Sequence, residues 1–217
     1  MTVAAPRELV IAASPIWILL RDAFTTRAPR GPVTIRLERR IGSGWVEFEH
    51  AWQLSSAGHL GFVNLGRSRD PAAVGTFDVR VHVSSPGTIA EAPGGDAAIT
   101  APVSGWWASA PAPAAPTELV LYPGPAYAFP SRTPLVAGRV LDAHGAPVPR
   151  ARVWSTAKVQ NALLTEEVRS DDDGRFRLPV RWSVGATDVQ STRGGQAGFT
   201  TVDVPADLSF THQITLT

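Results

Sequence analysis

The feature that most constrains the fold is an alternation of apolar and polar residues that runs through residues 135–180 and is broken by glycine turns. Residues 136–141 and 151–154 carry apolar side chains at every second position, the period of a strand with one buried face. A turn ending at Gly145 separates these two segments, and a second turn ending at Gly174 precedes a further alternating segment. Glycine takes the positive φ that tight turns require. The pattern predicts successive β-hairpins.

The composition fits a globular chain built mainly of strands. The 217 residues include 44% hydrophobic residues, enough for a real core in one or two domains. The 19 glycines and 19 prolines exceed average usage and favour short strands joined by tight turns. We therefore expect little helix.

Charge and cysteine content exclude several classes of protein. Lys and Arg number 20 against 19 Asp and Glu, so no whole-chain field favours nucleic acid or an anionic membrane. The absence of cysteine excludes disulfides and thiolate metal sites. The apolar run at residues 9–20 is interrupted by Ser14 and Pro15, lacks a basic flank and is too short to span a bilayer. We expect that the chain does not insert into a membrane. We expect it to be synthesised in the cytoplasm, which is compatible with release as part of a larger extracellular particle.

Landmarks in the first half of the chain return in the second half. The element P-x-E-L-V occurs at residues 6–10 and again at 116–120, an offset of 110. Two glycine-containing turns before alternating strands, near residues 31 and 55, recur at offsets of about 116. A nearly constant offset predicts a tandem duplication. The alternative is that all-β proteins reuse the same turn chemistry, although no turn requires P-x-E-L-V.

The Ala/Pro tract at residues 108–116 is the predicted linker, because alternating Ala and Pro favour an extended chain without a core. The predicted organisation is an N-terminal β-sandwich over residues 1–107, this linker, and a C-terminal β-sandwich over residues 117–217. Residues 84–95 are expected to form a loop. The strands expected around it span residues 33–37, 45–52, 60–65 and 76–83 in the first copy, and residues 167–170, 175–180, 187–191, 198–204 and 211–216 in the second.

The C-terminal half resembles the carboxypeptidase regulatory-like domain, a seven-stranded Greek-key sandwich of the transthyretin type. The matching pattern is G-x-V-x-D-x-x-G-x-P-V-x-x-A-x-V followed by D-x-D-G-x-F-x-L. It is carried by Gly138, Val140, Asp142, Gly145, Pro147, Val148, Ala151, Val153, Asp171, Asp173, Gly174, Phe176 and Leu178. The resemblance implies an accessory module, and a fold alone does not give an activity.

Two enzyme families with a similar opening segment lack support in the remaining residues. A 5-hydroxyisourate hydrolase has a histidine where this chain has Arg139, and a different C-terminus. Intradiol dioxygenases hold ferric iron with two tyrosines and a His-x-His pair. Here Tyr122 and Tyr127 both precede the motif, and no His-x-His exists. We expect no enzyme and no cofactor.

No metal site is predicted. The five histidines lack the close spacing of a metal-binding pair. The aspartates before Gly174 offer oxygen ligands of the kind that Ca²⁺ prefers, but aspartate before glycine is explained by turn preference alone.

Aromatic residues near the predicted linker are the candidate partner contacts. Trp106 and Trp107 are adjacent, so on a strand they point to opposite faces and one core cannot bury both. The same argument applies to the segment around Tyr127. The candidate contacts are Trp106, Trp107, Tyr122, Tyr127 and Phe129.

Residues 119–130, running into 136–140, resemble modules found beside or fused to cap proteins of phage-tail-like contractile injection systems. This resemblance implies a non-catalytic structural, protein-binding component of a larger assembly, at a cap or baseplate, with cap, sheath or baseplate proteins as partners. The alternatives are a carbohydrate- or surface-binding module, which needs exposed aromatic residues, and an unrecognised hydrolase, which needs a pocket with convergent polar groups.

Overall fold

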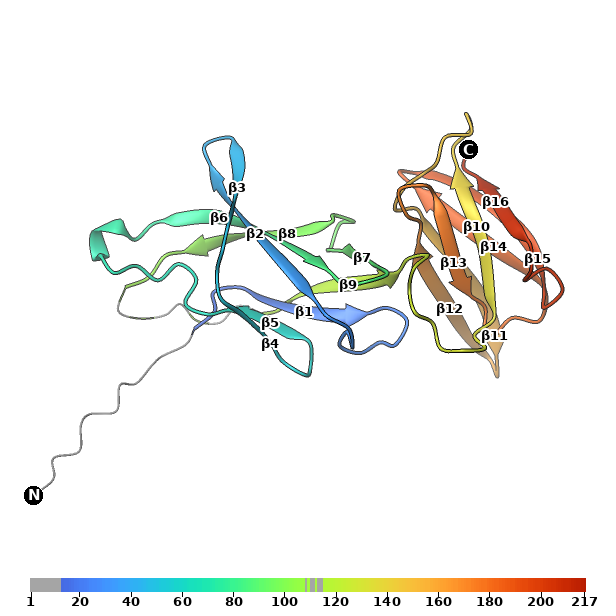
Figure 1. Ribbon diagram of the computed structural model, residues 1–217, viewed down its shortest axis with the longest axis horizontal. Helices are drawn as coiled ribbons and strands as arrows, with labels where there is room; N and C mark the ends of the chain where they lie inside the picture. The colour runs from blue at the N-terminus through green and yellow to red at the C-terminus, as the bar shows by residue number, and fades with distance from the viewer. Residues whose placement is uncertain (1–12, 108, 110–111, 113–114) are drawn as a thin grey trace, which may run out of the picture.

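The computed structural model describes residues 13–107, 109, 112 and 115–217. Two β-sandwiches lie end to end along the long axis of the molecule (Figure 1). A single turn of 3₁₀ helix, η1 (Pro71–Ala73), is the only helical segment among the described residues. The predicted fold class, all-β and built of β-sandwiches, is confirmed.

The N-terminal sandwich packs a five-stranded sheet, in the order β4-β5-β1-β9-β7, against a four-stranded sheet in the order β3-β2-β6-β8. Ile18, Leu60 and Phe62 are fully buried between them, together with Val79 and Leu119. The strands are β1 (Trp17–Asp22), β2 (Thr34–Ile41), β3 (Gly44–Phe48), β4 (Trp52–Leu54), β5 (His59–Phe62), β6 (Thr76–Ser84), β7 (Thr88–Glu91), β8 (Ala98–Ser104) and β9 (Thr117–Pro123).

The C-terminal sandwich packs a three-stranded sheet, β13-β10-β16, against a four-stranded sheet, β12-β11-β14-β15. Its core is built around Val140, Val153, Phe176, Leu178 and Ile214. The strands are β10 (Leu135–Leu141), β11 (Arg152–Val159), β12 (Ala162–Arg169), β13 (Arg175–Pro179), β14 (Gly185–Arg193), β15 (Gln196–Val204) and β16 (Thr211–Thr215).

Seven strands follow the same order in both sandwiches. In each, the first strand lies between an antiparallel and a parallel neighbour: β1 between β5 and β9, and β10 between β13 and β16. The four-stranded sheets also match strand for strand. The first three strands begin at residues 17, 34 and 44 in one copy and at 135, 152 and 162 in the other, a constant offset of 118. The N-terminal sandwich differs by two added edge strands, β4 and β7.

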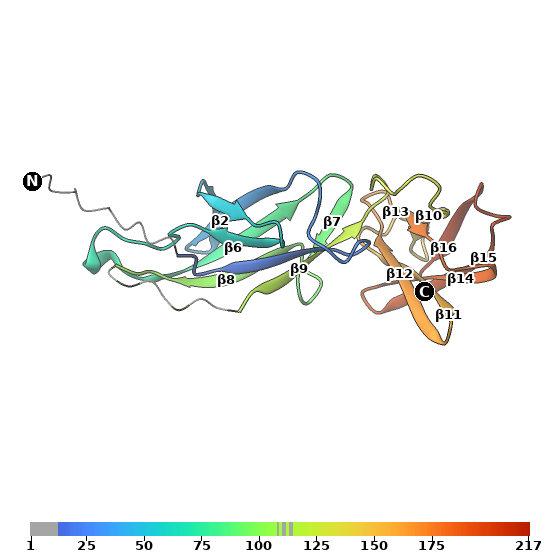
Figure 2. The same cartoon turned by 90° about the horizontal axis from the view of Figure 1, so that it is seen from below.

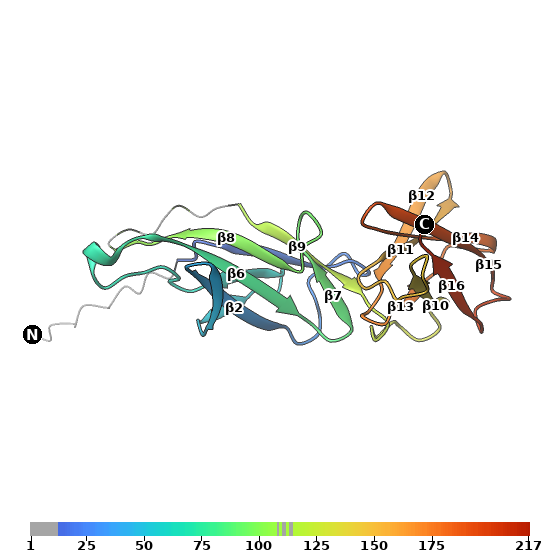
Figure 3. The ribbon, with the colours of Figure 1, turned by 90° about the horizontal axis from the view of Figure 1, so that it is seen from above.

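The strand β9 corrects the predicted boundary. We expected residue 117 to begin the C-terminal sandwich, but β9 pairs with β1 and β7 and closes the N-terminal one (Figures 2 and 3). The Ala/Pro tract therefore connects β8 to β9 within one sandwich, with residues 108, 110, 111, 113 and 114 outside the described part. The segment that joins the two sandwiches is residues 124–134.

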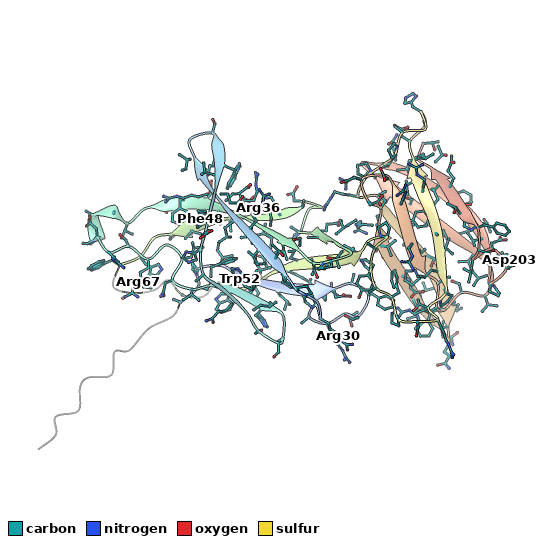
Figure 4. All side chains as sticks on the ribbon, in the orientation of Figure 1. Arg30, Arg36, Phe48, Trp52, Arg67 and Asp203 are labelled. Carbon is teal, nitrogen blue, oxygen red and sulfur yellow. The ribbon has the colours of Figure 1, made fainter. Side chains whose placement is uncertain are left out.

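Two other segments differ from expectation. The predicted loop at residues 84–95 contains β7, which pairs with β9. The predicted strand at residues 45–52 divides into β3, which pairs with β2, and β4, which pairs with β5 in the opposite sheet. Figure 4 shows Phe48 and Trp52 along the segment that makes this crossing. The first P-x-E-L-V element, at residues 6–10, lies outside the described residues.

The two aspartate–glycine turns of the C-terminal sandwich share one construction. The Asp142 carboxylate accepts hydrogen bonds from the backbone N–H groups of His144 and Ala146, and Asp171 accepts from Asp173 and Arg175 in the same way. Gly145 and Gly174 follow at φ 82° and 73°, as predicted for these turns. The motif aspartates thus satisfy turn amides.

Replacing Asp171 with alanine tests this role. We expect Asp171→Ala to lower the free energy of unfolding by about 1–2 kcal/mol, because two turn amides lose a charged acceptor. The matched control, Asp172→Ala, changes an exposed neighbour and should stay within about 0.5 kcal/mol of the parent. Urea denaturation measures both. A rise in melting temperature on adding Ca²⁺ would contradict the turn-only role.

Candidate functional site at the junction of the sandwiches

The two adjacent tryptophans, which follow β8, differ in burial. Trp106 is buried, and its indole Nε1 donates a hydrogen bond to the Leu65 carbonyl at 3.2 Å. The Arg67 guanidinium lies over its ring. Trp107 is 46% exposed. Of this pair, Trp106 is part of the N-terminal sandwich, and Trp107 remains a candidate contact.

The other three candidate residues, Tyr122, Tyr127 and Phe129, are half-buried where the sandwiches meet. The Tyr127 hydroxyl donates a hydrogen bond of 2.7 Å to Asp22 at the end of β1. The rings of Tyr127 and Phe129 are 4.8 Å apart at their centroids, and both pack edge-on against Phe24. These aromatic side chains therefore make contacts within the chain and hold the connecting segment against β1.

Arg169, at the end of β12, is the central residue of the junction. Its side chain is 4% exposed. The guanidinium donates two hydrogen bonds, of 2.6 and 2.9 Å, to the Glu91 carboxylate of β7. It also pairs with Glu167 at 2.6 Å and lies 3.6 Å from the centroid of the Tyr122 ring. A bidentate, aromatic-stacked arginine of this kind fixes both distance and orientation.

Three further arginines of the C-terminal sandwich reach the N-terminal sandwich or the connecting segment. Arg150 donates to the Ala90 carbonyl at 2.6 Å, and Arg177 donates to the Pro125 carbonyl at 3.1 Å. Arg181 lies 4.2 Å from the centroid of the Phe24 ring and is held by the buried Glu166. We call Arg150, Arg169, Arg177 and Arg181 the junction arginines. They contact four separate points of the N-terminal sandwich and the connecting segment.

The electrostatics of the junction depend on Glu91. Burial acts to raise the pKa of the Glu91 carboxyl, but the hydrogen bonds and charge of Arg169 outweigh it and lower the pKa below its ordinary value of 4.5. Burial acts to lower the pKa of the Arg169 guanidinium. The hydrogen bonds and charges of Glu91 and Glu167 outweigh burial and raise this pKa above its ordinary value. Burial raises the pKa of Tyr122, so its ring remains neutral under the guanidinium.

The lowered pKa of Glu91 predicts that acid loosens the junction. A carboxyl whose folded pKa is depressed stabilises the folded arrangement above its unfolded pKa, and this contribution disappears as the pH falls through the folded pKa. We expect an intact junction between pH 5 and 7 and progressive loosening below about pH 4.5. Small-angle X-ray scattering should show a broader distribution of distances in acid. The variant Glu91→Gln should lose this pH dependence, and an unchanged acid response in it would contradict the assignment.

A cavity of about 320 Å³ opens beside the junction, with Asp22, Arg30 and Tyr127 in its lining. Figure 4 shows Arg30 on the loop that follows β1. The Asp22 carboxylate is occupied, because it accepts from the backbone N–H groups of Phe24 and Thr25 as well as from Tyr127. Its role in this arrangement is to cap the loop.

The described residues contain no cluster of three or more His, Cys, Asp or Glu side chains able to hold a metal ion. No helix within the described ranges is long and apolar enough to cross a bilayer.

The junction arginines were missed by sequence reasoning. Only Lys158 among the 20 basic residues is a lysine, and such a preference for arginine favours bidentate pairs and aromatic stacking. The sequence therefore contained a signal for ion-paired contacts. It did not indicate which arginines meet the other sandwich, because that depends on how the two sandwiches are placed.

Comparison with known proteins supports the resemblance of the C-terminal sandwich. Residues 136–217 match the family model of the carboxypeptidase regulatory-like domain. No curated protein matches the chain.

Two solved structures show distant likeness over nearly the whole chain. The Bacillus anthracis TIE protein is 13% identical, with a TM-score of 0.30, over 94% of this chain and 34% of that protein. A streptococcal ancillary pilin is 12% identical, with a TM-score of 0.29, over 93% of this chain and 62% of that protein. The chain thus spans only a part of each of these proteins.

Proposed function

We propose that this chain is a non-catalytic structural module that holds protein partners at a fixed spacing within a larger assembly. The observation that carries the proposal is the junction, where four arginines of one sandwich contact the other sandwich and the connecting segment. Sandwiches joined by a free linker move independently. A buried bidentate ion pair with aromatic packing instead makes one elongated body from the two.

The family match supports a module of this type. Carboxypeptidase regulatory-like domains are regulatory or binding folds, and the match covers the C-terminal sandwich. The shared order of seven strands and the offset of 118 between their first three strands support a tandem duplication. In this proposal the chain is a spacer of two related units.

The assembly we favour is the cap or baseplate of a phage-tail-like contractile injection particle. Its support is the resemblance of residues 119–130 and 136–140, which span β9, the connecting segment and the start of β10. The exposed Trp107 is then a candidate contact with cap, sheath or baseplate proteins.

One observation favours a carbohydrate-binding module as the second candidate. Phe199 on β15 is 67% exposed and lines a groove of about 510 Å³ together with Asp188 and Gln190. An exposed ring beside an acid and an amide offers both a stacking surface and hydrogen bonds to a sugar.

Affinity capture with the full chain as bait distinguishes these functions. We expect recovery of one defined protein in fixed proportion, with a Trp107→Ala variant binding it more weakly, and its identification by mass spectrometry as a cap, sheath or baseplate protein. Light scattering gives the stoichiometry. Recovery of a defined partner outside such particles would overturn the particular assembly. Binding to glycan arrays, lost in Phe199→Ala, without a protein partner would overturn the structural role.

A further inference from the structure

The ladder between β11 and β14 ends before either strand does. Its pairs run from Arg152 opposite Thr192 to Ser155 opposite Val189. Beyond Ser155, β11 continues for four residues to Val159, paired only with β12. On the other side, residues 185–188 of β14 are paired only with β15. Two neighbouring strands thus separate, and each keeps its outer partner.

The N-terminal sandwich offers a comparison within the same chain. There the ladder between β2 and β6 reaches Arg39, and the β2–β3 hairpin extends two residues further, to Ile41. The Arg40 guanidinium and the Asp78 carboxylate, 3.4 Å apart, bridge the two strands just beyond the last pair. On the other side, residues 76–78 of β6 pair only with β8. The corresponding strands of the C-terminal sandwich each extend four residues beyond their ladder. The opening is therefore longer in the second copy.

The opening forms a groove of about 550 Å³. Its walls are Thr156, Ala157 and Lys158 from β11 and residues 186–188 of β14. In an antiparallel strand, alternate residues direct their N–H and C=O groups to each side. Both walls therefore carry strand edges without a ladder partner among the described residues, and such edges are templates for another strand.

We propose that this groove receives an extended peptide segment of a protein partner, which adds a strand between β11 and β14. The inference rests on the proposed function, since it specifies where a protein partner binds. Main-chain hydrogen bonds supply affinity in strand addition, and pockets for alternate side chains supply specificity. The two free edges, each four residues long, fit a segment of about four residues in the ladder.

The surroundings of the groove define the chemistry of the segment. Lys158 lies on one wall and Asp188 on the other, so the groove has no net charge. Trp182 and Val184, 45% and 89% exposed, lie beside it and follow Arg181 of the junction. A segment with apolar residues on the side facing Trp182 and Val184, and neutral polar residues on the other, is complementary to this site. Its bound position adjoins the junction.

Random heptapeptides displayed on phage and selected on the full chain are the probe. We expect enriched sequences that alternate apolar and polar residues. Hydrogen exchange with an enriched peptide should show protection of amides in residues 156–159 and 185–188. Ala186→Arg, which fills the groove from an exposed position, should weaken binding at least tenfold, and the exposed turn variant Ala143→Arg should bind within twofold of the parent.

Protection elsewhere, or equal binding by Ala186→Arg, would overturn the strand-addition site. A neutral hexasaccharide that protects no amides but competes with the peptides would assign the groove to glycans instead. If affinity capture recovers a protein partner equally well with Ala186→Arg, this inference fails and the proposed function stands. If the full chain captures no protein, the proposed function fails first.

Discussion

Replacing Arg169 with alanine should uncouple the two sandwiches. The variant leaves the carboxylates of Glu91 and Glu167 without the cation that both contact, and it removes the group stacked on Tyr122. Removing one partner of a buried ion pair costs about 3–5 kcal/mol. We expect the contacts between the two sandwiches to lose this amount of stabilisation, while the core of each sandwich stays folded. Scattering should show a broader range of end-to-end distances, and denaturation followed by tryptophan fluorescence should change from one transition to two.

Arg175→Ala is the matched control for this experiment. Arg175 is also an arginine of the C-terminal sandwich, but its side chain is 61% exposed and pairs with an equally exposed Asp173. Exposed pairs of this kind contribute about 0–1 kcal/mol, so its scattering profile should match the parent. A scattering profile and a single denaturation transition unchanged in Arg169→Ala would show that the junction does not depend on this ion pair, and the rigid-spacer proposal would lose its main support.

Local alternation was sufficient to predict where strands lie but not which strands pair with each other. The expected strand at residues 76–83 corresponds closely to β6, and the one at 136–141 to β10. Both carry strict alternation on a half-buried face. By contrast, β9 has the same local pattern and belongs to the other sandwich, because its partner β1 is about 100 residues earlier in sequence. Periodicity shows that a segment is a strand, and pairing over such distances is decided by tertiary packing.

The candidate contacts show the same limit. Adjacency predicted that one core cannot bury both Trp106 and Trp107, and only Trp106 is buried, but adjacency did not indicate which of the two it would be. Tyr127 and Phe129 were proposed as partner contacts and instead pack on Phe24, a residue with no motif to mark it. Aromatic side chains at a junction and at a free surface look alike in sequence, since both need large apolar area.

The motif glycine Gly138 should tolerate no side chain at all. A Cβ added there would lie 2.5 Å from Cζ of Phe176 and 2.6 Å from the backbone oxygen of His212. Phe176 is 1% exposed and belongs to the same motif. The Phe176 ring occupies the space that a side chain at position 138 would need, which explains why this glycine and this phenylalanine belong to the same motif. We expect Gly138→Ala to destabilise the C-terminal sandwich by about 3 kcal/mol through overpacking.

Gly75→Ala is the control, because a Cβ there meets nothing within 4 Å and Gly75 does not have positive φ. Its stability should change by less than about 0.5 kcal/mol, with a small gain from the stiffer unfolded chain. The double variant Gly138→Ala/Phe176→Leu tests the cause. Leucine at position 176 removes the clash between the added Cβ and the ring, but not the clash with the backbone oxygen of His212. The loss of stability in the double variant should therefore be smaller than the sum of the two single losses by more than about 0.5 kcal/mol. Full additivity in urea denaturation would show that the ring does not exclude a side chain at Gly138.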